Sequence, residues 1–236
     1  MSTDKKPTTA MLHYSAPPVV GGVEAVIQAH ADAFSQAGYP VTVIAGRGQK
    51  DALPPGTDLI QIPLIDSQHD QIIELSSELE QGQVPDAYGA MVERLVSELG
   101  PTLEQFDNVI MHNVLTKHYN LALTEALARL LEDGTIRNGI AWCHDFTWTS
   151  PRSRPKVHSG HPWDLLRTFL PGMTYVTVSK DRQKELAGLL DCPREQVHVA
   201  YNGVDPATLL SLSSDGRELI ERLHLLTCDL VLLMPV

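Results

Sequence analysis

The stretch Ser15-Ala-Pro-Pro-Val-Val-Gly-Gly-Val-Glu24 joins a short apolar run to a helical pattern. Residues 8–13, before it, have the composition of a strand. After it, apolar residues recur at helical spacing as far as Ala37, and Gly38 follows as the expected end of the helix. A strand, a glycine-containing turn and a helix in this order predict the first βα unit of a doubly wound sheet.

The glycine pair Gly21-Gly22 lies at the turn of this βα unit and has two interpretations. Glycine lets a ligand approach the backbone closely, and the N–H groups at the start of a helix can receive an anion. The pair therefore forms either a cradle for a diphosphate or a sugar, or a tight turn that binds nothing.

The rest of the chain repeats the alternation of strands and helices. Further strands are predicted at residues 41–45, 58–63, 108–112, 139–143, 174–178, 197–201 and 230–234. Helices are predicted at residues 70–81, 86–99, 117–132, 163–170, 180–190 and 215–224, with Gly100-Pro101 ending the second and Ser179 capping the fifth. Several strands are apolar throughout, which is typical of parallel strands covered on both faces. The predicted fold class is α/β, a doubly wound, mainly parallel Rossmann-like sheet.

Composition excludes several classes of protein. With 236 residues, 43 % of them hydrophobic and 20 % charged, the chain has the composition of a soluble globular protein with a sizeable core. A formal net charge of -11 disfavours nucleic acid as a partner. No apolar run reaches the roughly 18–20 residues of a transmembrane helix, so no transmembrane segment is expected. The 3 cysteines show no CxxC spacing, which argues against a disulfide framework and favours a cytoplasmic location.

Polar residues follow many of the predicted strands. They are His13, the Gly21-Gly22 turn, His112-Asn113, His144-Asp145, Ser179 and Asn202. Because ligands bind at the carboxyl ends of parallel strands, we expect these residues to gather at one edge of the sheet. For each histidine the alternative is a hydrogen-bonded structural residue.

The loop after residues 139–143 carries two further patterns. It begins with His144-Asp145-Phe146-Thr147-Trp148, in which aromatic faces beside polar groups suit sugar rings, although the aromatic side chains could equally serve loop packing. It continues with a group of basic residues: Arg152, Arg154, Lys156, His158 and His161. These basic residues either meet a phosphate or carboxylate of a substrate or balance acidic neighbours. The chain has no GxGxxG after its first strand, no GxxxxGK[ST] and no GxSxG, which disfavours nicotinamide, P-loop and serine-hydrolase sites.

Four motifs, taken in order, resemble a known family. They are Gly21-Gly22-Val23-Glu24, the segment from His144 to Trp148, Val178-Ser179 before a helix, and Tyr201-Asn202-Gly203-Val204-Asp205. Together they resemble the N-terminal domain of GT-B glycosyltransferases of family 4, which are retaining, nucleotide-sugar-dependent enzymes. The resemblance covers roughly residues 9–236.

The resemblance implies roles for individual residues. Gly21 and Gly22 match the glycine loop that approaches the donor diphosphate, and His144 matches the histidine that contacts the donor sugar near the reaction centre. Candidates on the acceptor side are Glu24, His112, Asn113, Asp145, Trp148, Arg152 and Arg154. In such enzymes the leaving phosphate takes the proton of the acceptor, so neither a cofactor nor an obligatory metal is expected. The expected partners are a nucleotide-sugar donor and a small-molecule, lipid or glycan acceptor.

The resemblance also predicts the domain organisation. Residues 1–7 are expected to be disordered, residues 8–205 to form the acceptor-side domain, and residues 206–236 to form a linker and the first strand of an incomplete donor-binding domain. We therefore expect a truncated hexosyltransferase, inactive by itself, that self-associates through the unpaired apolar residues 229–236. The alternatives are a non-catalytic module that binds a sugar or glycoside, and a protein similar to sugar-nucleotide epimerases.

Overall fold

The computed structural model describes residues 6–204 and 213–232. The chain forms two compact units, residues 1–201 and residues 202–236. We expect residues 1–7 to be disordered, and residues 1–5 of this segment lie outside the described residues. Lys6, within the same predicted segment, lies with its Nζ 4.6 Å from the centre of the Tyr39 ring.

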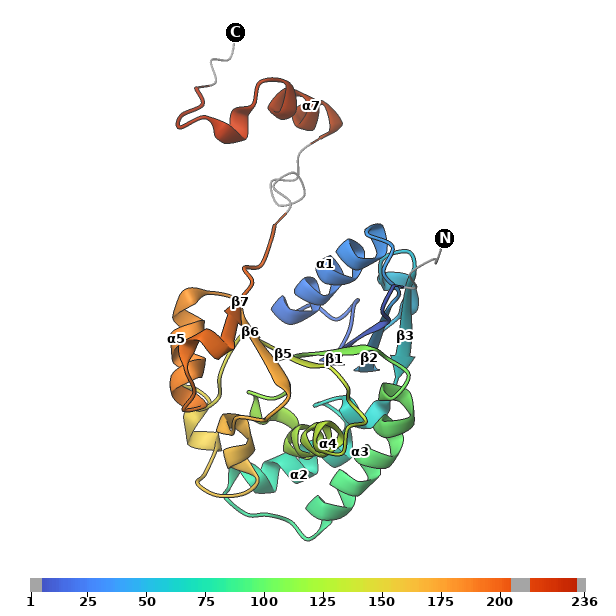
Figure 1. Cartoon of the computed structure of the whole chain (residues 1–236), viewed down its shortest axis with the longest axis vertical. Coiled ribbons are helices and arrows are strands. Elements are labelled where there is room, and N and C mark those ends of the chain that lie inside the picture. Colours follow the sequence, from blue (N-terminus) through green and yellow to red (C-terminus); the bar gives the residue numbers. More distant parts are fainter. Residues whose placement is uncertain (1–5, 205–212, 233–236) are drawn as a thin grey trace. The chain divides into compact units, whose positions relative to one another are not determined.

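The first unit is built on a parallel sheet. In the described residues its seven strands have the order β3-β2-β1-β4-β5-β6-β7 (Figure 1). Their bounds are β1 Thr9–Ser15, β2 Val41–Arg47, β3 Thr57–Gln61, β4 Asn108–His112, β5 Gly139–Cys143, β6 Met173–Thr177 and β7 Val197–Val199. Each neighbouring pair is parallel. The predicted doubly wound α/β sheet is confirmed, and its strand order reverses between β1 and β4.

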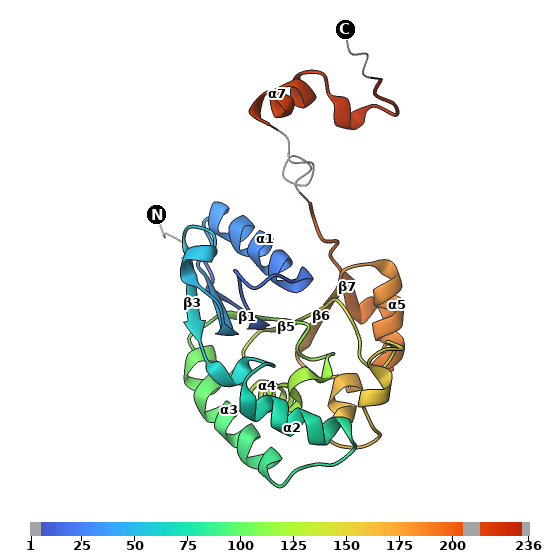
Figure 2. The same ribbon diagram turned by 180° about the vertical axis from the view of Figure 1, so that it is seen from behind.

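Helices cover both faces of the sheet. The helices of the first unit are α1 Gly22–Gln36, α2 Asp70–Glu80, α3 Ala87–Leu103, α4 Leu121–Glu132 and α5 Lys180–Leu189. Short 3₁₀ turns lie between them: η1 Lys50–Ala52, η2 Pro63–Ile65, η3 His118–Asn120, η4 Arg154–Lys156, η5 Trp163–Arg167 and η6 Arg194–Gln196. Helix α1 lies on one face, and α2, α3 and α4 lie on the other (Figures 1 and 2).

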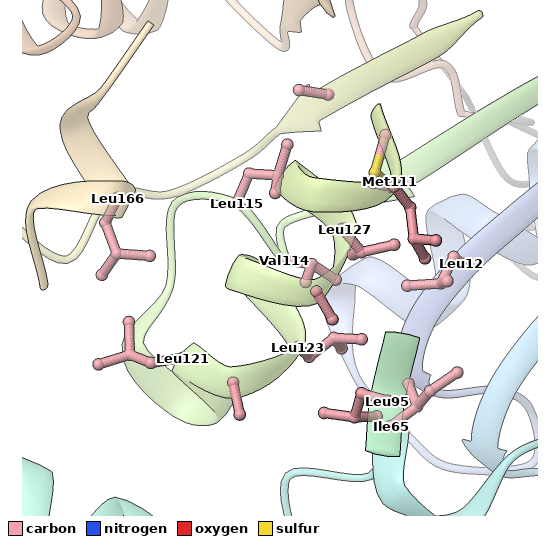
Figure 3. Close-up of a cluster of buried hydrophobic side chains, with 14 of the residues drawn as sticks. Leu12, Ile65, Leu95, Met111, Val114, Leu115, Leu121, Leu123, Leu127 and Leu166 are labelled. Atoms are coloured by element: carbon pink, nitrogen blue, oxygen red, sulfur yellow. The ribbon is translucent and has the colours of Figure 1, made fainter. Parts of the chain in front are cut away.

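Side chains of the central strands alternate between two apolar cores. Leu12 of β1 belongs to the larger core, with α3 and α4, whereas its neighbour Met11 packs with Ile27 and Ala31 of α1. Figure 3 shows part of the larger core, including Leu12 and Leu127. Because successive strand side chains point to opposite faces, a strand buried on both faces is apolar at every position.

Helix α3 does not end at Gly100-Pro101, and this prediction was wrong. It continues to Leu103, which is fully buried in the larger core, as is Leu99. Burial of one leucine contributes about 1.5–3 kcal/mol, comparable with the roughly 3 kcal/mol that proline costs inside a helix. A hydrogen bond from the Glu104 N–H to the Gly100 carbonyl (3.0 Å) closes the last turn. Tertiary packing therefore overrides the local stop signal.

Helix α4 begins four residues later than predicted, at Leu121 instead of Lys117. Asn120 caps it: its Oδ1 accepts a hydrogen bond from the Leu123 N–H (3.1 Å), and its Nδ2 donates to the Leu64 carbonyl (2.9 Å). Lys117 is thus left in the connection that follows β4. The predicted helix at residues 163–170 is instead the 3₁₀ turn η5.

The second unit contains α7 Ser214–Arg222 and the 3₁₀ turn η7 Leu225–Thr227. Of the strand predicted at residues 230–234, residues 230–232 form no strand, and residues 233 and 234 lie outside the described residues. Leu230 and Leu232 are 74 % and 82 % exposed. In the parts of the chain that the structure describes, no helix combines the length and apolar character needed to cross a membrane.

The packing of α4 leads to a prediction about stability. Leu127 is fully buried in the larger core, so Leu127→Ala should lower the free energy of unfolding by about 2–5 kcal/mol. Ile73 of α2 is 46 % exposed, and Ile73→Ala should change the same quantity by no more than about 0.5 kcal/mol. Urea unfolding of both variants tests this prediction, and equal losses would show that the larger core does not carry the stability.

Candidate active site

A cleft of about 460 Å³ lies at the carboxyl edge of the sheet. Its lining comes from β1, the start of α1, the end of β2 and the segments that follow β3, β4 and β5. It includes His13, Ser15, Glu24, Arg47, Asn113, Lys117, Tyr119 and Asp145. Because the strand order reverses between β1 and β4, the cleft is at the position where doubly wound sheets bind ligands.

Asn113 joins the segments that follow β4 and β5. Its side-chain Oδ1 accepts hydrogen bonds from the backbone N–H groups of His144 (3.1 Å) and Asp145 (3.0 Å). Its φ of 59° lies in the left-handed region, which asparagine tolerates better than most other residues with a side chain. The Thr116 hydroxyl adds a bond to the Asp145 carbonyl (2.8 Å). The two segments are therefore held as one unit.

His144 lies in a cluster of histidines at the ends of β1, β4 and β5. Its Nε2 is 3.4 Å from Nδ1 of His112, whose ring is fully buried. The pKa of His144 is lowered to about 4, chiefly by burial; the nearby His13 and His30 contribute to the lowering, and Asp145 opposes it. Burial likewise lowers the pKa of His112 well below its ordinary value. Both imidazoles are neutral at pH 7.

Only some of the histidines reach the cleft. His13 lines it, and its Nδ1 is 2.7 Å from the His112 carbonyl. Asn113 and Asp145 also line the cleft, whereas His144 and His112 are not among its lining residues. In the part of the chain that the structure describes, the Nε2 atom of His112 has no hydrogen-bond partner.

The start of α1 places a carboxylate beside the glycine turn. Gly21 caps the helix with extended backbone, and Glu24 lies three residues later. A Cβ atom at Gly21 would come within 2.1 Å of Oε2 of Glu24, so a side chain at this position would displace the carboxylate from its present place. The Ser15 hydroxyl donates a hydrogen bond to Oε1 of Glu24 (2.6 Å). The space that an anion could occupy at the helix start is thus taken by Glu24, which would have to move aside for a diphosphate.

Trp148, Arg152 and Arg154 are not among the residues that line the cleft. The Trp148 indole is buried, its N–H donates to the Trp163 carbonyl (3.2 Å), and the guanidinium of Arg154 lies 4.5 Å from its ring centre. A second guanidinium, that of Arg167, lies 4.0 Å from the same ring. Arg152 is exposed. The aromatic residue therefore packs the loop together, which was one of its two interpretations.

The basic loop is paired with acidic helices. Lys156 forms an ion pair with Glu80 of α2 (3.0 Å), and Nε2 of His161 lies 2.8 Å from Oε2 of Glu125 of α4. A cavity of about 570 Å³ lies next to this second pair, between α4 and residues 161–171. Glu125 also accepts a hydrogen bond from the Tyr88 hydroxyl (2.8 Å), so its oxygens are already used by the protein. These contacts match the interpretation in which the basic residues balance acidic neighbours.

Lys117 and Tyr119 of the cleft were missed in the sequence. Lys117 is 7 % exposed and lines the cleft, although the apolar spacing places it at the start of a helix. The signal that could have located it is its position shortly after a strand that ends in His112-Asn113. In the described part of the chain, no three His, Cys, Asp or Glu side chains are grouped so that they could hold a metal ion.

The sequence and the fold were compared with known proteins. The profile of the family described as Glycosyltransferase Family 4 matches residues 20–208. Among solved structures, WaaG, a glycosyltransferase involved in lipopolysaccharide biosynthesis, is similar with 14 % identity and a TM-score of 0.52, over 92 % of this chain and 51 % of WaaG. An alpha-glucosyltransferase in complex with UDP and a 13-mer DNA containing a HMU base shows 13 % identity and a TM-score of 0.47, over 87 % of this chain and 45 % of that one. The chain thus spans about half the length of these structures. No curated protein matches it.

The histidine cluster leads to a prediction about pH. The pKa values of His112 and His144 in the folded protein lie below the value of about 6.5 expected for an unfolded chain. Below pH 6.5 the unfolded chain therefore binds protons that the folded protein does not, and the free energy of unfolding falls as the pH decreases. Each histidine adds a slope of at most about 1.4 kcal/mol per pH unit, which for His144 ends near pH 4.

Urea unfolding between pH 7 and pH 4 measures this slope. His144→Gln should reduce the slope relative to the unsubstituted protein, whatever its effect on stability at pH 7. His158→Gln, outside the cluster, serves as the control. A His144→Gln protein with an unchanged slope would contradict the assignment.

Proposed function

This chain belongs to glycosyltransferase family 4, and we propose that it forms the acceptor-side part of a retaining, nucleotide-sugar-dependent transferase with the GT-B fold. The observation that supports this most is the cleft at the strand-order reversal, where Asn113 fixes the segment that carries His144. The proposed partners are a nucleotide-hexose donor and a small-molecule, lipid or glycan acceptor, in the cytoplasm.

In the proposed mechanism, His144 contacts the donor sugar near the carbon that is transferred. A neutral imidazole at this position adds no positive charge beside a sugar carbon that itself becomes positive in the transition state. The acceptor hydroxyl attacks on the face from which the phosphate leaves, and the leaving phosphate takes the hydroxyl proton. The bond from the sugar carbon to the phosphate oxygen breaks as the bond to the acceptor oxygen forms.

The carboxylates of the cleft do not need to act as nucleophiles in this mechanism. Glu24 accepts a hydrogen bond from the Ser15 hydroxyl, and the carboxylate of Asp145 lies 3.6 Å from the guanidinium of Arg182. Because both carboxylates already have partners in the protein, we propose that they shape the acceptor site. The protein then contributes positioning and charge stabilisation, and no cofactor or obligatory metal takes part.

The donor diphosphate is proposed to approach Gly21 and Gly22. This requires Glu24 to leave the helix start, because a carboxylate and a diphosphate repel each other there. The remaining donor contacts are assigned to a second half of the GT-B fold, since the chain spans 51 % of the WaaG structure. By itself, the 236-residue chain is proposed to transfer no sugar.

The test compares sugar transfer by proteins in which residues 1–236 precede a second GT-B half. His144→Ala should lower turnover by a factor on the order of 10² or more, as loss of a positioned polar contact does. His158→Ala, which removes a histidine that contacts the Glu80 carbonyl and the Trp163 ring, should retain turnover. Unchanged turnover in His144→Ala would leave His144 a structural residue, and transfer by residues 1–236 alone would contradict the assignment of the donor site.

A further inference from the structure

We propose that Lys117 binds an anionic group, a phosphate or a carboxylate, of the ligand that enters the cleft. The inference rests on the proposed function only for the identity of that ligand, the sugar donor or the acceptor. It stands on the burial of this lysine, on its lack of a charged partner among residues 6–204 and 213–232, and on the fixed backbone around it.

Lys117 differs from the other charged residues of the cleft in its partners. Arg47 pairs with Asp66 (3.3 Å), while Glu24 and Asp145 have the partners described above. Across the described residues, no carboxylate lies within the 4.0 Å of an ion pair from Nζ of Lys117. Its contact there is with the face of the Tyr119 ring, 5.1 Å from Nζ to the ring centre.

This position is costly for an ammonium group unless a ligand supplies the opposite charge. Lys117 is only 7 % exposed and lines the cleft, so most of its side chain is out of contact with water, although Nζ itself is not among the fully buried unpartnered atoms of the described residues. A charge taken from water needs a partner, and an aromatic face compensates only part of the loss. An anion in the cleft would restore the lost stabilisation, and the pair would interact more strongly there than in bulk water.

The backbone on both sides of Lys117 is held in place. The Thr116 hydroxyl donates to the Asp145 carbonyl (2.8 Å), and the Thr116 carbonyl accepts the Thr147 N–H (2.9 Å). On the other side, the His118 N–H donates to the Thr147 hydroxyl oxygen (3.2 Å). The segment after β5 thus fixes the residues that flank Lys117. A ligand that binds here does not have to order this part of the backbone.

Two sources could supply the anion: the diphosphate of a nucleotide-sugar donor, or a phosphate or carboxylate on the acceptor. Their shared chemistry is an anionic oxygen group that accepts a charge-assisted hydrogen bond from an ammonium. The experiment separates them by using UDP as the probe for the donor, glucose 6-phosphate as the probe for an anionic acceptor, and glucose as the neutral control.

NMR-monitored titrations of the 236-residue chain measure the dissociation constants. Lys117→Gln should raise the constant for UDP or for glucose 6-phosphate by about 10-fold or more, while Lys117→Arg, which keeps the charge, should preserve most of the affinity. Lys184→Gln, at an exposed position on α5, is the matched control and should change neither constant. Thermal melting shows that each variant is folded.

The possible outcomes distinguish the two sources of the anion from each other and from failure of the proposal. Loss confined to glucose 6-phosphate assigns the anion to the acceptor, and loss confined to UDP assigns it to the donor. Equal constants in Lys117→Gln and the unsubstituted chain, a loss that extends equally to glucose, or failure of both anions to bind would overturn the proposal. Because binding and not transfer is measured, absence of sugar transfer in a protein that joins residues 1–236 to a second GT-B half would refute the proposed function and leave this result standing.

Discussion

The two hydrogen bonds that Oδ1 of Asn113 accepts, from the N–H groups of His144 and Asp145, hold the candidate site together. The ladder between β4 and β5 reaches only as far as the pair His112–Trp142, followed by one bond from the Asn113 N–H to the Trp142 carbonyl (2.9 Å). Beyond that point the two segments are joined mainly by side chains, with one further backbone bond from the Thr147 N–H to the Thr116 carbonyl (2.9 Å). Asn113 joins them from a left-handed backbone, and the Thr116 and Thr147 bonds continue the connection towards Lys117.

This arrangement has a cost in stability. His112 is fully buried, and its Nε2 lacks a partner within the described residues, an arrangement that costs about 1–3 kcal/mol. Burial also keeps His144 neutral. Groups that would be more stable in water are thus kept together at the strand ends, which is typical of a site selected for binding or chemistry.

The sequence predicted the elements whose signals are local. Apolar runs alternating with helical patterns predicted the parallel sheet, and Ser179 caps α5 as predicted. The course of α3 through Pro101 could not be predicted, because it depends on the burial of Leu103 against other elements. Lys117 was missed because its neighbours fit the spacing of α4, although Asn120 starts that helix.

The candidate site shows the same division between local signals and packing. Which aromatic residues face a ligand depends on the packing of a whole loop, and Trp148 is buried with two guanidiniums close to its ring. The position of Glu24 over Gly21 depends on a side-chain conformation that the residue pattern does not determine. The roles of His144, Gly21 and Gly22 in catalysis remain predictions.

Hydrogen exchange of individual backbone amides in Asn113→Gly tests most directly whether Asn113 fixes the site. Glycine accepts a φ of 59° without strain but removes the acceptor oxygen. The amides of His144 and Asp145 should exchange faster by a factor on the order of 10 or more. The Leu123 amide, which is held in the same way by the Asn120 side chain, should keep its rate. Unchanged exchange at His144 and Asp145 would show that Asn113 does not hold these residues in place.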